Sequence, residues 1–198
     1  MSAPAVDGVI LAAGLSRRME RPKPLLNVGA MTFLERAVMT LRAAGCRRTY
    51  VVVNAAEDAV IDAARGLDVA VVMNDYPESA PLDSLQLVLE RLPDDTAAVV
   101  VLPVDLPLIA EESAAALVRS FQENPGPLIL PFHNGVAGHP VLISRELFTD
   151  VMTRPLEEGL RTLIMESART LREVKVVDPG ILIDIDTPDD YWRFIETK

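Results

Sequence analysis

Three positively charged residues follow a short apolar run near the start of the chain, in an order that suits a polyphosphate. The run at 9–11 leads into small residues at 12–14, and Arg17, Arg18 and Lys23 come next. Small residues let the backbone approach a ligand closely, while loop N–H groups and basic side chains hold phosphate oxygens. A strand followed by a basic surface loop has the same composition, so the residue types alone leave both interpretations open.

Two commoner phosphate-binding motifs are missing from the sequence. A P-loop requires Gly, four residues and then Gly-Lys-Ser/Thr, and the dinucleotide fingerprint requires Gly-x-Gly-x-x-Gly. No segment has the first form, and Gly8 and Gly14 are too far apart for the second. ATPases of the P-loop kind and nicotinamide-dependent enzymes are therefore disfavoured.

Carboxylates that could hold a metal ion stand at two other places. Asp105 lies just past an apolar run and between two prolines, and Asp184 and Asp186 alternate with isoleucines. On a strand, the alternating pair would project from one face. Magnesium prefers oxygen ligands and commonly takes one or two carboxylates together with substrate phosphates. Asp105 could instead cap a following helix, and the alternating pair could be a solvated strand end.

Apolar strands that alternate with amphipathic helices must position these residues. We expect strands at 6–11, 49–53, 69–73, 97–102, 128–132, 141–144, 171–177 and 182–185. We expect helices to begin at Thr32 in a capping box with Glu35, at Asp83 with Gln86, and at a Thr187 cap, with others at 57–65, 111–122, 145–152 and 156–167. Such alternation predicts an α/β fold whose mostly parallel sheet is covered on both faces. Ligands bind beyond the carboxyl ends of such strands, so the loops after the first and fourth strands should share one edge.

Composition narrows the class of protein. We expect one domain over all 198 residues, 49% of which are hydrophobic, and the net charge of −10 argues against a nucleic-acid partner. Cys46 is the only cysteine, which argues against a disulfide framework. No apolar run approaches the ~20 residues that span a bilayer, and no signal peptide is recognisable. A cytoplasmic protein without a membrane partner is the expectation.

The order of residues over 11–26 is more specific than their composition. Leu-Ala-Ala-Gly-x-Ser-x-Arg-Met, followed by Pro-Lys-x-Leu-Leu, resembles the signature loop of the nucleotidyltransferase superfamily. Within it, the sequence is most similar to the molybdenum cofactor cytidylyltransferase and guanylyltransferase group. Three later segments resemble that group in the same order: Pro103-Val104-Asp105-Leu106-Pro107, Gly138-His139-Pro140-Val141 and Asp184-Ile185-Asp186-Thr187-Pro188.

The resemblance implies a three-layer sandwich with a mostly parallel, Rossmann-like sheet, of the nucleotide-diphospho-sugar transferase type. It also implies the reaction, in which a phosphate on an acceptor attacks the α-phosphorus of a nucleoside triphosphate and pyrophosphate leaves, with Mg²⁺ as cofactor. Positioning and charge stabilisation supply most of the catalysis in phosphoryl transfer. The resemblance places the nucleotide against Leu11, Ala12, Ala13, Gly14, Ser16, Arg17, Lys23 and Ser84.

The same resemblance assigns the remaining roles. Lys23, Arg17, Arg18 and Asp105 would act in catalysis, and Asp105 and Asp186, with Asp184 as a further candidate, would hold the metal. His139 and Gly138 would lie in the acceptor pocket, where His139 orients the acceptor rather than acting as an acid or base. A lone histidine is more often structural, and that interpretation stays open.

Details of the loops favour particular substrates. Cytidine-specific members tend to carry Leu-Ala-Ala-Gly where guanosine-specific ones carry Leu-Ala-Gly-Gly, so Ala13 favours CTP. Molybdopterin would then be the acceptor, and a molybdoenzyme would receive the product. The segment Ala80-Pro81-Leu82-Asp83 differs from the family pattern, which leaves a sugar phosphate or an alcohol phosphate open as acceptor. A non-catalytic nucleotide- or cofactor-binding protein on the same fold is the third alternative.

Overall fold

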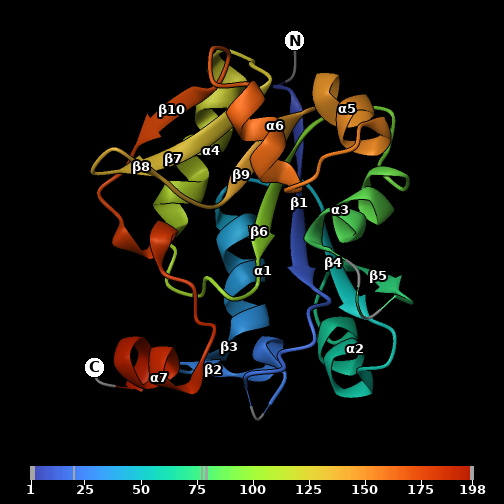
Figure 1. Cartoon of the computed structure of the whole chain (residues 1–198), viewed down its shortest axis with the longest axis vertical. Coiled ribbons are helices and arrows are strands. Elements are labelled where there is room, and N and C mark those ends of the chain that lie inside the picture. The colour runs from blue at the N-terminus through green and yellow to red at the C-terminus, as the bar shows by residue number, and fades with distance from the viewer. Residues whose placement is uncertain (1–2, 20, 77, 79, 197–198) are drawn as a thin grey trace.

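A mixed sheet in the order β10-β7-β9-β6-β1-β4-β5, with β8 paired to β7, forms the middle layer of the fold (Figure 1). This computed structural model describes residues 3–19, 21–76, 78 and 80–196. Parallel pairing joins β1 to β4 and β6, β4 to β5, and β7 to β10, whereas β9 is antiparallel to both β6 and β7. The strands are β1 (Ala5–Ala12), β4 (Thr49–Asn54), β5 (Ala70–Asn74), β6 (Thr96–Pro103), β7 (Leu128–His133), β8 (Val136–Ala137), β9 (Val141–Ser144) and β10 (Arg172–Lys175).

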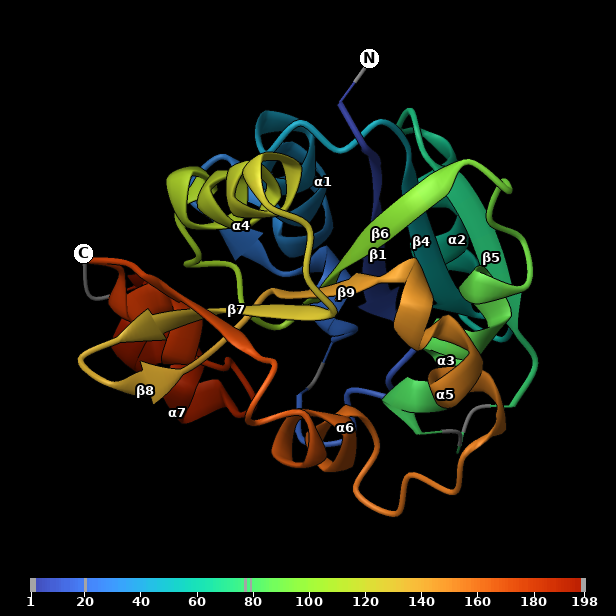
Figure 2. The ribbon, with the colours of Figure 1, turned by 90° about the horizontal axis from the view of Figure 1, so that it is seen from above.

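Helices cover both faces of this sheet, which confirms the expected α/β sandwich (Figure 2). Helices α1, α2 and α4 pack on one face, and α3, α5 and α6 pack on the other. The helices are α1 (Phe33–Ala43), α2 (Asp58–Arg65), α3 (Pro81–Leu89), α4 (Glu111–Glu123), α5 (Phe148–Thr153), α6 (Leu160–Glu166) and α7 (Pro188–Tyr191). A short hairpin, β2 (Asn27–Val28) and β3 (Met31–Thr32), precedes α1. None of the described helices is long and apolar enough to cross a bilayer.

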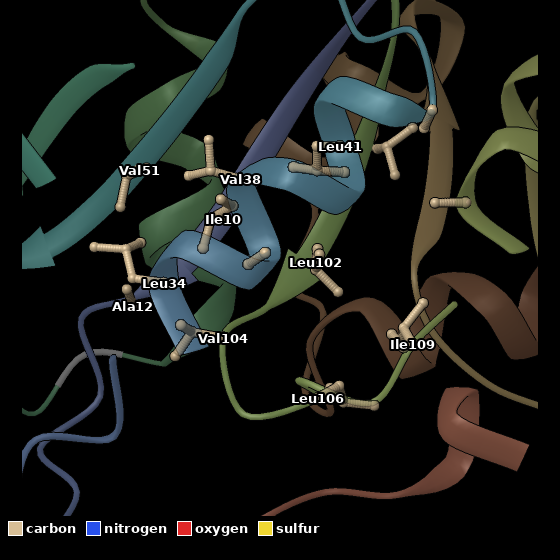
Figure 3. Packing of buried hydrophobic residues seen from close by; sticks show 14 of the residues in the cluster. Ile10, Ala12, Leu34, Val38, Leu41, Val51, Leu102, Val104, Leu106 and Ile109 are labelled. Carbon is tan, nitrogen blue, oxygen red and sulfur yellow. The ribbon is translucent and has the colours of Figure 1, made fainter. Parts of the chain in front are cut away.

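Successive side chains of the central strands enter two different cores. In β6, Val100 and Leu102 join the cluster that contains α1 and α4, whereas Val99 and Val101 join the cluster that contains α3. Figure 3 shows Leu102 among residues of α1 and β1 on the first of these faces. This alternation follows from the two-residue period of a strand, and it explains why a strand covered on both faces is apolar throughout.

Helix α1 begins where the sequence predicts. The Thr32 hydroxyl accepts from the Glu35 N–H at 3.1 Å, and the Glu35 carboxylate accepts from the Thr32 N–H at 2.6 Å. This capping box satisfies two backbone donors that would otherwise lack partners. The predicted stripe of the helix is buried against the sheet: Leu34, Ala37, Val38 and Leu41.

Two expected helix starts and one expected strand are wrong, each for a local reason. Helix α3 begins at Pro81, because proline suits the first helical turn, and Asp83 accepts from the Ala80 N–H at 2.7 Å instead of acting as the N-cap. Helix α6 begins only at Leu160, because Gly159 has a φ of +61°. The expected strand at 182–185 does not form: a 3-10 turn spans Pro179–Leu182, and 183–186 is extended chain without a strand partner.

Candidate active site

The loops that follow β1 and β6 leave the same edge of the sheet, as predicted. These two strands are parallel neighbours, Leu11 is paired with Pro103, and the Val104 N–H donates to the Leu11 carbonyl at 3.1 Å. The loop after β1 carries Lys23, and the loop after β6 carries Asp105. The two residues therefore lie close together. This is the edge at which parallel sheets bind ligands.

A cavity of about 410 Å³ opens at this edge. That volume falls within the usual range for small-molecule sites. Most of the residues that the sequence proposed for the nucleotide, the catalysis and the metal line it: Leu11, Ala13, Gly14, Ser16, Arg17, Arg18, Lys23, Ser84, Asp105 and Asp186. Ala12, Asp184, Gly138 and His139 are not among the lining residues.

Lys23 joins the two acidic segments at the floor of the site. Its ammonium donates to Asp105 Oδ2 at 3.1 Å and to Asp186 Oδ1 at 2.5 Å, and its side chain is 13% exposed. Burial by itself would lower the pKa of Lys23, but its hydrogen bonds to Asp186 and Asp105 and the negative charges of both carboxylates outweigh burial and raise it. The hydrogen bond from Lys23 lowers the pKa of Asp186. Both groups are therefore charged at neutral pH, and Lys23 sits where a cation between the two carboxylates would be held.

The expected placement of Asp184 and Asp186 on one face of a strand is wrong, because the segment is not a strand. The Lys23 ammonium contacts Asp186 and Asp105. Asp184 lies outside the Lys23 contact, and burial, followed by the charges of Asp105 and Asp186, raises its pKa.

Among the described residues, no group of three or more His, Cys, Asp or Glu side chains is arranged to hold a metal ion. Two carboxylates do converge on one cation position, between Asp105 and Asp186. Magnesium commonly takes one or two protein carboxylates and completes its shell with substrate phosphates and water. The donor set therefore fits a metal ion that arrives together with a triphosphate.

The loop from Gly14 to Lys23 is held in shape by one serine. Ser16 has a φ of +47°, its carbonyl accepts from the Met19 N–H at 2.8 Å, and its hydroxyl accepts from the Lys23 N–H at 2.9 Å. A Cβ added at Gly14 would meet no atom within 4 Å. Packing within the protein therefore does not require glycine at this position. Close approach of a ligand to the backbone would explain why glycine stands there.

The two arginines of the loop are paired with acids at the mouth of the cavity. Arg17 donates to Glu78, and Arg18 donates to Asp186 Oδ2 at 3.1 Å. Both arginine side chains are about two thirds exposed, at 66% and 67%. Exposed pairs of this kind contribute little to stability, so phosphate oxygens can replace the carboxylates at small cost.

Two of the proposed nucleotide contacts lie deeper than the others. The Ala12 side chain is 4% exposed and packs in the core cluster with α1. Ser84 is also 4% exposed, and its hydroxyl accepts from Asn74 Nδ2 at 3.0 Å. Ser84 nevertheless lines the cavity.

His139 and Gly138 lie outside the cavity lining. The His139 N–H donates to the Ile181 carbonyl at 3.0 Å, and His139 Nδ1 is buried without a partner in the described part of the chain. Burial lowers the pKa of His139, and the negative charge of Asp105 opposes that shift. A Cβ at Gly138 would lie 2.3 Å from the Ile181 oxygen, so close packing requires the glycine.

Sequence reasoning missed several lining residues, most of them apolar. They are Leu15, Pro24, Pro81, Pro103 and Val104. Three of them lie within two residues of a charged candidate: Pro24 beside Lys23, and Pro103 and Val104 before Asp105. That proximity was the signal that could have identified them. Pro81 comes from the start of α3, the helix that also carries the expected nucleotide contact Ser84.

Comparison with known proteins agrees with this geometry. The family model of the MobA-like NTP transferase domain matches residues 8–172. The chain is 30% identical to a molybdenum cofactor guanylyltransferase of Xanthomonas euvesicatoria pv. vesicatoria, covering 95% of this chain and 93% of that protein. It is 36% identical over 63 residues to the molybdenum cofactor cytidylyltransferase of Escherichia coli, a match that spans about a third (32%) of each protein.

A further relative has a different activity in its name. Over 79 residues the chain is 48% identical to a bifunctional IPC transferase and DIPP synthase of Rubrobacter xylanophilus, covering 36% of this chain and 18% of that protein. The matches to this relative and to the Escherichia coli protein thus span well under two thirds of either relative's length.

Solved structures share the whole fold. Rv0371c of Mycobacterium tuberculosis H37Rv has a TM-score of 0.84 and 26% identity, covering 99% of this chain and 100% of that one. The same protein in complex with manganese has a TM-score of 0.78 and 25% identity, over 98% and 100% of the two chains. The family match over most of the chain, together with the loop, the lysine and the paired carboxylates at one sheet edge, shows that this chain belongs to the MobA-like NTP transferase domain family.

Proposed function

We propose that the protein is a cytoplasmic, Mg²⁺-dependent nucleotidyltransferase that transfers CMP from CTP to a molybdopterin-type acceptor and releases pyrophosphate. The observation that carries the proposal is the contact of the Lys23 ammonium with both Asp105 and Asp186 at the floor of a nucleotide-sized cavity. These three residues come from three distant parts of the chain, and together they provide a cation position beside a phosphate-binding loop. A molybdoenzyme that receives the product is the partner that this function implies.

Each residue of the site would have a separate role in phosphoryl transfer. The Gly14–Lys23 loop would wrap the triphosphate, and Arg17 and Arg18 would exchange Glu78 and Asp186 for phosphate oxygens. Lys23 would donate to the α-phosphate, where negative charge builds up as the acceptor phosphate attacks. The metal, when bound on Asp105 and Asp186, would neutralise and orient the triphosphate.

Base recognition in this proposal depends on Ala13 and Ser84. Both line the cavity. Ala13 narrows the slot relative to the glycine of guanosine-specific members, which favours a pyrimidine. Ser84 has its acceptor side occupied by Asn74, which leaves its hydroxyl proton to donate to a base or ribose oxygen.

A different acceptor is the second candidate. The relative from Rubrobacter xylanophilus, named for IPC transferase and DIPP synthase activities, shares 48% identity over 79 residues. The altered segment Ala80-Pro81-Leu82-Asp83 begins helix α3 at the cavity, where Pro81 lines it. An alcohol phosphate or sugar phosphate acceptor with CTP is therefore the alternative to molybdopterin.

The test is a pyrophosphate-release assay on the purified protein. CTP and GTP, each with Mg²⁺, are combined with molybdopterin, an alcohol phosphate and a sugar phosphate. The proposal expects the highest turnover with CTP and molybdopterin, and loss of that turnover in Asp105→Asn and in Asp186→Asn. Asp95→Asn is the matched control, because Asp95 pairs with Arg47 away from the cavity. Preference for an alcohol phosphate would establish the second candidate, and nucleotide binding without pyrophosphate release from any pair would establish a non-catalytic protein.

A further inference from the structure

Three segments that are far apart in the sequence meet beside the cavity residues Asp105 and Asp186, and two of them carry one of these carboxylates. The segment 104–110 follows β6 and carries Asp105. The turn 138–140 precedes β9, and the segment 178–187 leads into α7 and carries Asp186. The last segment contains no strand, so the place of Asp186 depends on contacts with other segments, and those with 104–110 and 138–140 are among them.

Backbone hydrogen bonds connect these segments at two points. The His139 N–H donates to the Ile181 carbonyl at 3.0 Å, and the Ile185 N–H donates to the Asp105 carbonyl at 2.8 Å. The second bond joins Ile185, the residue immediately before Asp186, to the backbone of Asp105. A displacement of 178–185 would therefore move Asp186 relative to Asp105.

Two glycines allow the segments to touch. A Cβ at Gly180 would lie 2.2 Å from the Leu108 oxygen, and a Cβ at Gly138 would lie 2.3 Å from the Ile181 oxygen. Real Cβ atoms do not approach a carbonyl so closely, so any side chain at either position would push the segments apart. The packing is tight enough to transmit a small shift.

The side chain of Asp178 holds this junction together. It is buried, at 8% exposure, and its Oδ1 accepts from the Gly180 N–H at 2.9 Å. Its Oδ2 accepts from the Ala110 N–H at 2.9 Å and from the Ser113 hydroxyl at 2.7 Å. Helix α4 begins after Ala110, which has no side-chain acceptor, so a carboxylate from 68 residues away caps it.

We propose that Asp178 is a positioning residue for the reaction, because it fixes the turn at 179–182 against 104–110 and thereby sets the place of Asp186 beside Asp105. Asp178 lies outside the cavity lining, and its side chain accepts from Ala110, Ser113 and Gly180 rather than contacting Asp105 or Asp186. Its effect passes through Gly180, Ile185 and the backbone of Asp105. This inference rests on the nucleotidyl transfer proposed above.

The experiment compares two perturbations of the junction with two matched substitutions elsewhere. Asp178→Asn keeps the side-chain volume but replaces one of the two acceptor oxygens with a donor, so the amide cannot accept from both the Gly180 N–H and the Ala110 N–H. Gly180→Ala pushes the same turn away from Leu108 without changing any charge. Asp7→Asn is the control for the first, since Asp7 is a buried carboxylate with three donor contacts at the opposite end of β1. Gly66→Ala is the control for the second, because its Cβ would meet Ala63 O at an ordinary 3.4 Å.

Each variant is measured for melting temperature, for Mn²⁺ affinity in the presence of CTP by electron paramagnetic resonance, and for kcat and KM. We expect Asp178→Asn and Gly180→Ala to bind Mn²⁺ with CTP about tenfold more weakly or worse, the usual effect of losing an outer-shell support. Their kcat should fall by a similar factor, with a smaller change in the KM for CTP. The controls should keep the wild-type Mn²⁺ affinity, even where their melting temperature falls.

Two outcomes would overturn the inference in different ways. If the two junction variants lower only the melting temperature and keep the wild-type Mn²⁺ affinity and kcat, Asp178 merely caps α4. If wild type binds no Mn²⁺ in the presence of CTP, the proposed function fails and the inference fails with it. A loss confined to the junction variants, with wild type and both controls active, would support both.

Discussion

Lys23 contacts both carboxylates of the proposed metal site, so one substitution at this residue tests two expectations. Its ammonium bridges carboxylates that are 82 and 163 residues away in the chain. In Lys23→Met the two carboxylates would lose the ammonium that lies between them, so we expect the variant to bind Mn²⁺ alone more tightly than wild type does. Turnover should fall by 10²–10³-fold, about 2.7–4 kcal/mol, because a donor to the developing charge is lost.

Calorimetric titration with Mn²⁺ in the absence of nucleotide, followed by a pyrophosphate-release assay, checks both expectations on one preparation. Arg21→Met is the control, since Arg21 belongs to the same loop but does not line the cavity. Unchanged turnover in Lys23→Met would remove Lys23 from the catalytic machinery. Weaker Mn²⁺ binding would mean that the ammonium does not occupy the metal position.

His139 gives a pH dependence whose sign follows from burial. Burial lowers its pKa in the folded protein, while the unfolded chain has a histidine of ordinary pKa, about 6.5. Below that value the unfolded state binds a proton that the folded state does not, so stability falls as the pH falls. We expect His139→Gln to lose less of its free energy of unfolding than wild type when the pH is lowered from about 7 to 5.

Urea unfolding of both proteins at a series of pH values measures this difference. All other titrating groups are shared, so the difference between the two curves isolates His139. Parallel curves would show that the imidazole gains its proton equally in both states. That result would contradict a buried, neutral His139.

Among the elements, we propose that the loop between β1 and the 3-10 turn Lys23–Leu25 selects the nucleotide. The Ser16 hydroxyl fixes its two ends together, and Ala13 and Gly14 face the cavity. If the Ala13 methyl narrows the base slot, CTP with Mg²⁺ should raise the melting temperature of wild type more than GTP with Mg²⁺ does. Ala13→Gly should reduce that difference or reverse it.

A thermal-shift experiment with both nucleotides on both proteins makes this measurement. Equal or better protection of wild type by GTP would exclude the preference for CTP. If Ala13→Gly left the difference between the two melting-temperature shifts unchanged, the base would be selected elsewhere. Ser84 and Pro81, at the start of α3, are then the next cavity residues to test.

At the scale of the whole molecule, the end of the sheet opposite the cavity is held by a buried ion pair. Asp7 of β1 is fully buried, and Arg47 donates to it at 3.2 and 3.0 Å, with the Thr96 hydroxyl at 2.6 Å. The pair joins the amino ends of β1 and β6 to the segment that precedes β4. Removing Arg47 would leave a carboxylate without its counter-charge in the core.

We therefore expect Arg47→Met to lower the free energy of unfolding by about 3–5 kcal/mol, toward the lower end because the Arg47 side chain is 32% exposed. The double variant Arg47→Met/Asp7→Asn should recover part of that loss, because no unpaired charge remains. Urea unfolding measures both, and the turnover of the folded protein should stay at the wild-type level. Equal instability of the single and double variants would contradict a buried charge as the cause.

The sequence by itself determined the parts of this protein that depend on neighbouring residues. The Thr32–Glu35 capping box, the buried stripe of α1 and the apolar strands are set by residues a few positions apart, and their period matches the local geometry of a helix or strand. Because the carboxyl ends of parallel strands share one edge, the same pattern also indicated that the loops with Lys23 and Asp105 would meet.

Only the tertiary structure decided how the charges of the site are paired. Nothing local in the sequence indicates that Lys23 contacts both Asp105 and Asp186, or that Asp178 accepts from the Ala110 N–H, 68 residues earlier in the chain. The segment 183–186 has the alternation of a strand, yet it finds its partner in the backbone of Asp105 rather than in a neighbouring strand. Contacts between such distant segments depend on how the elements pack, because a side chain's pattern along the chain fixes its face but not its partner.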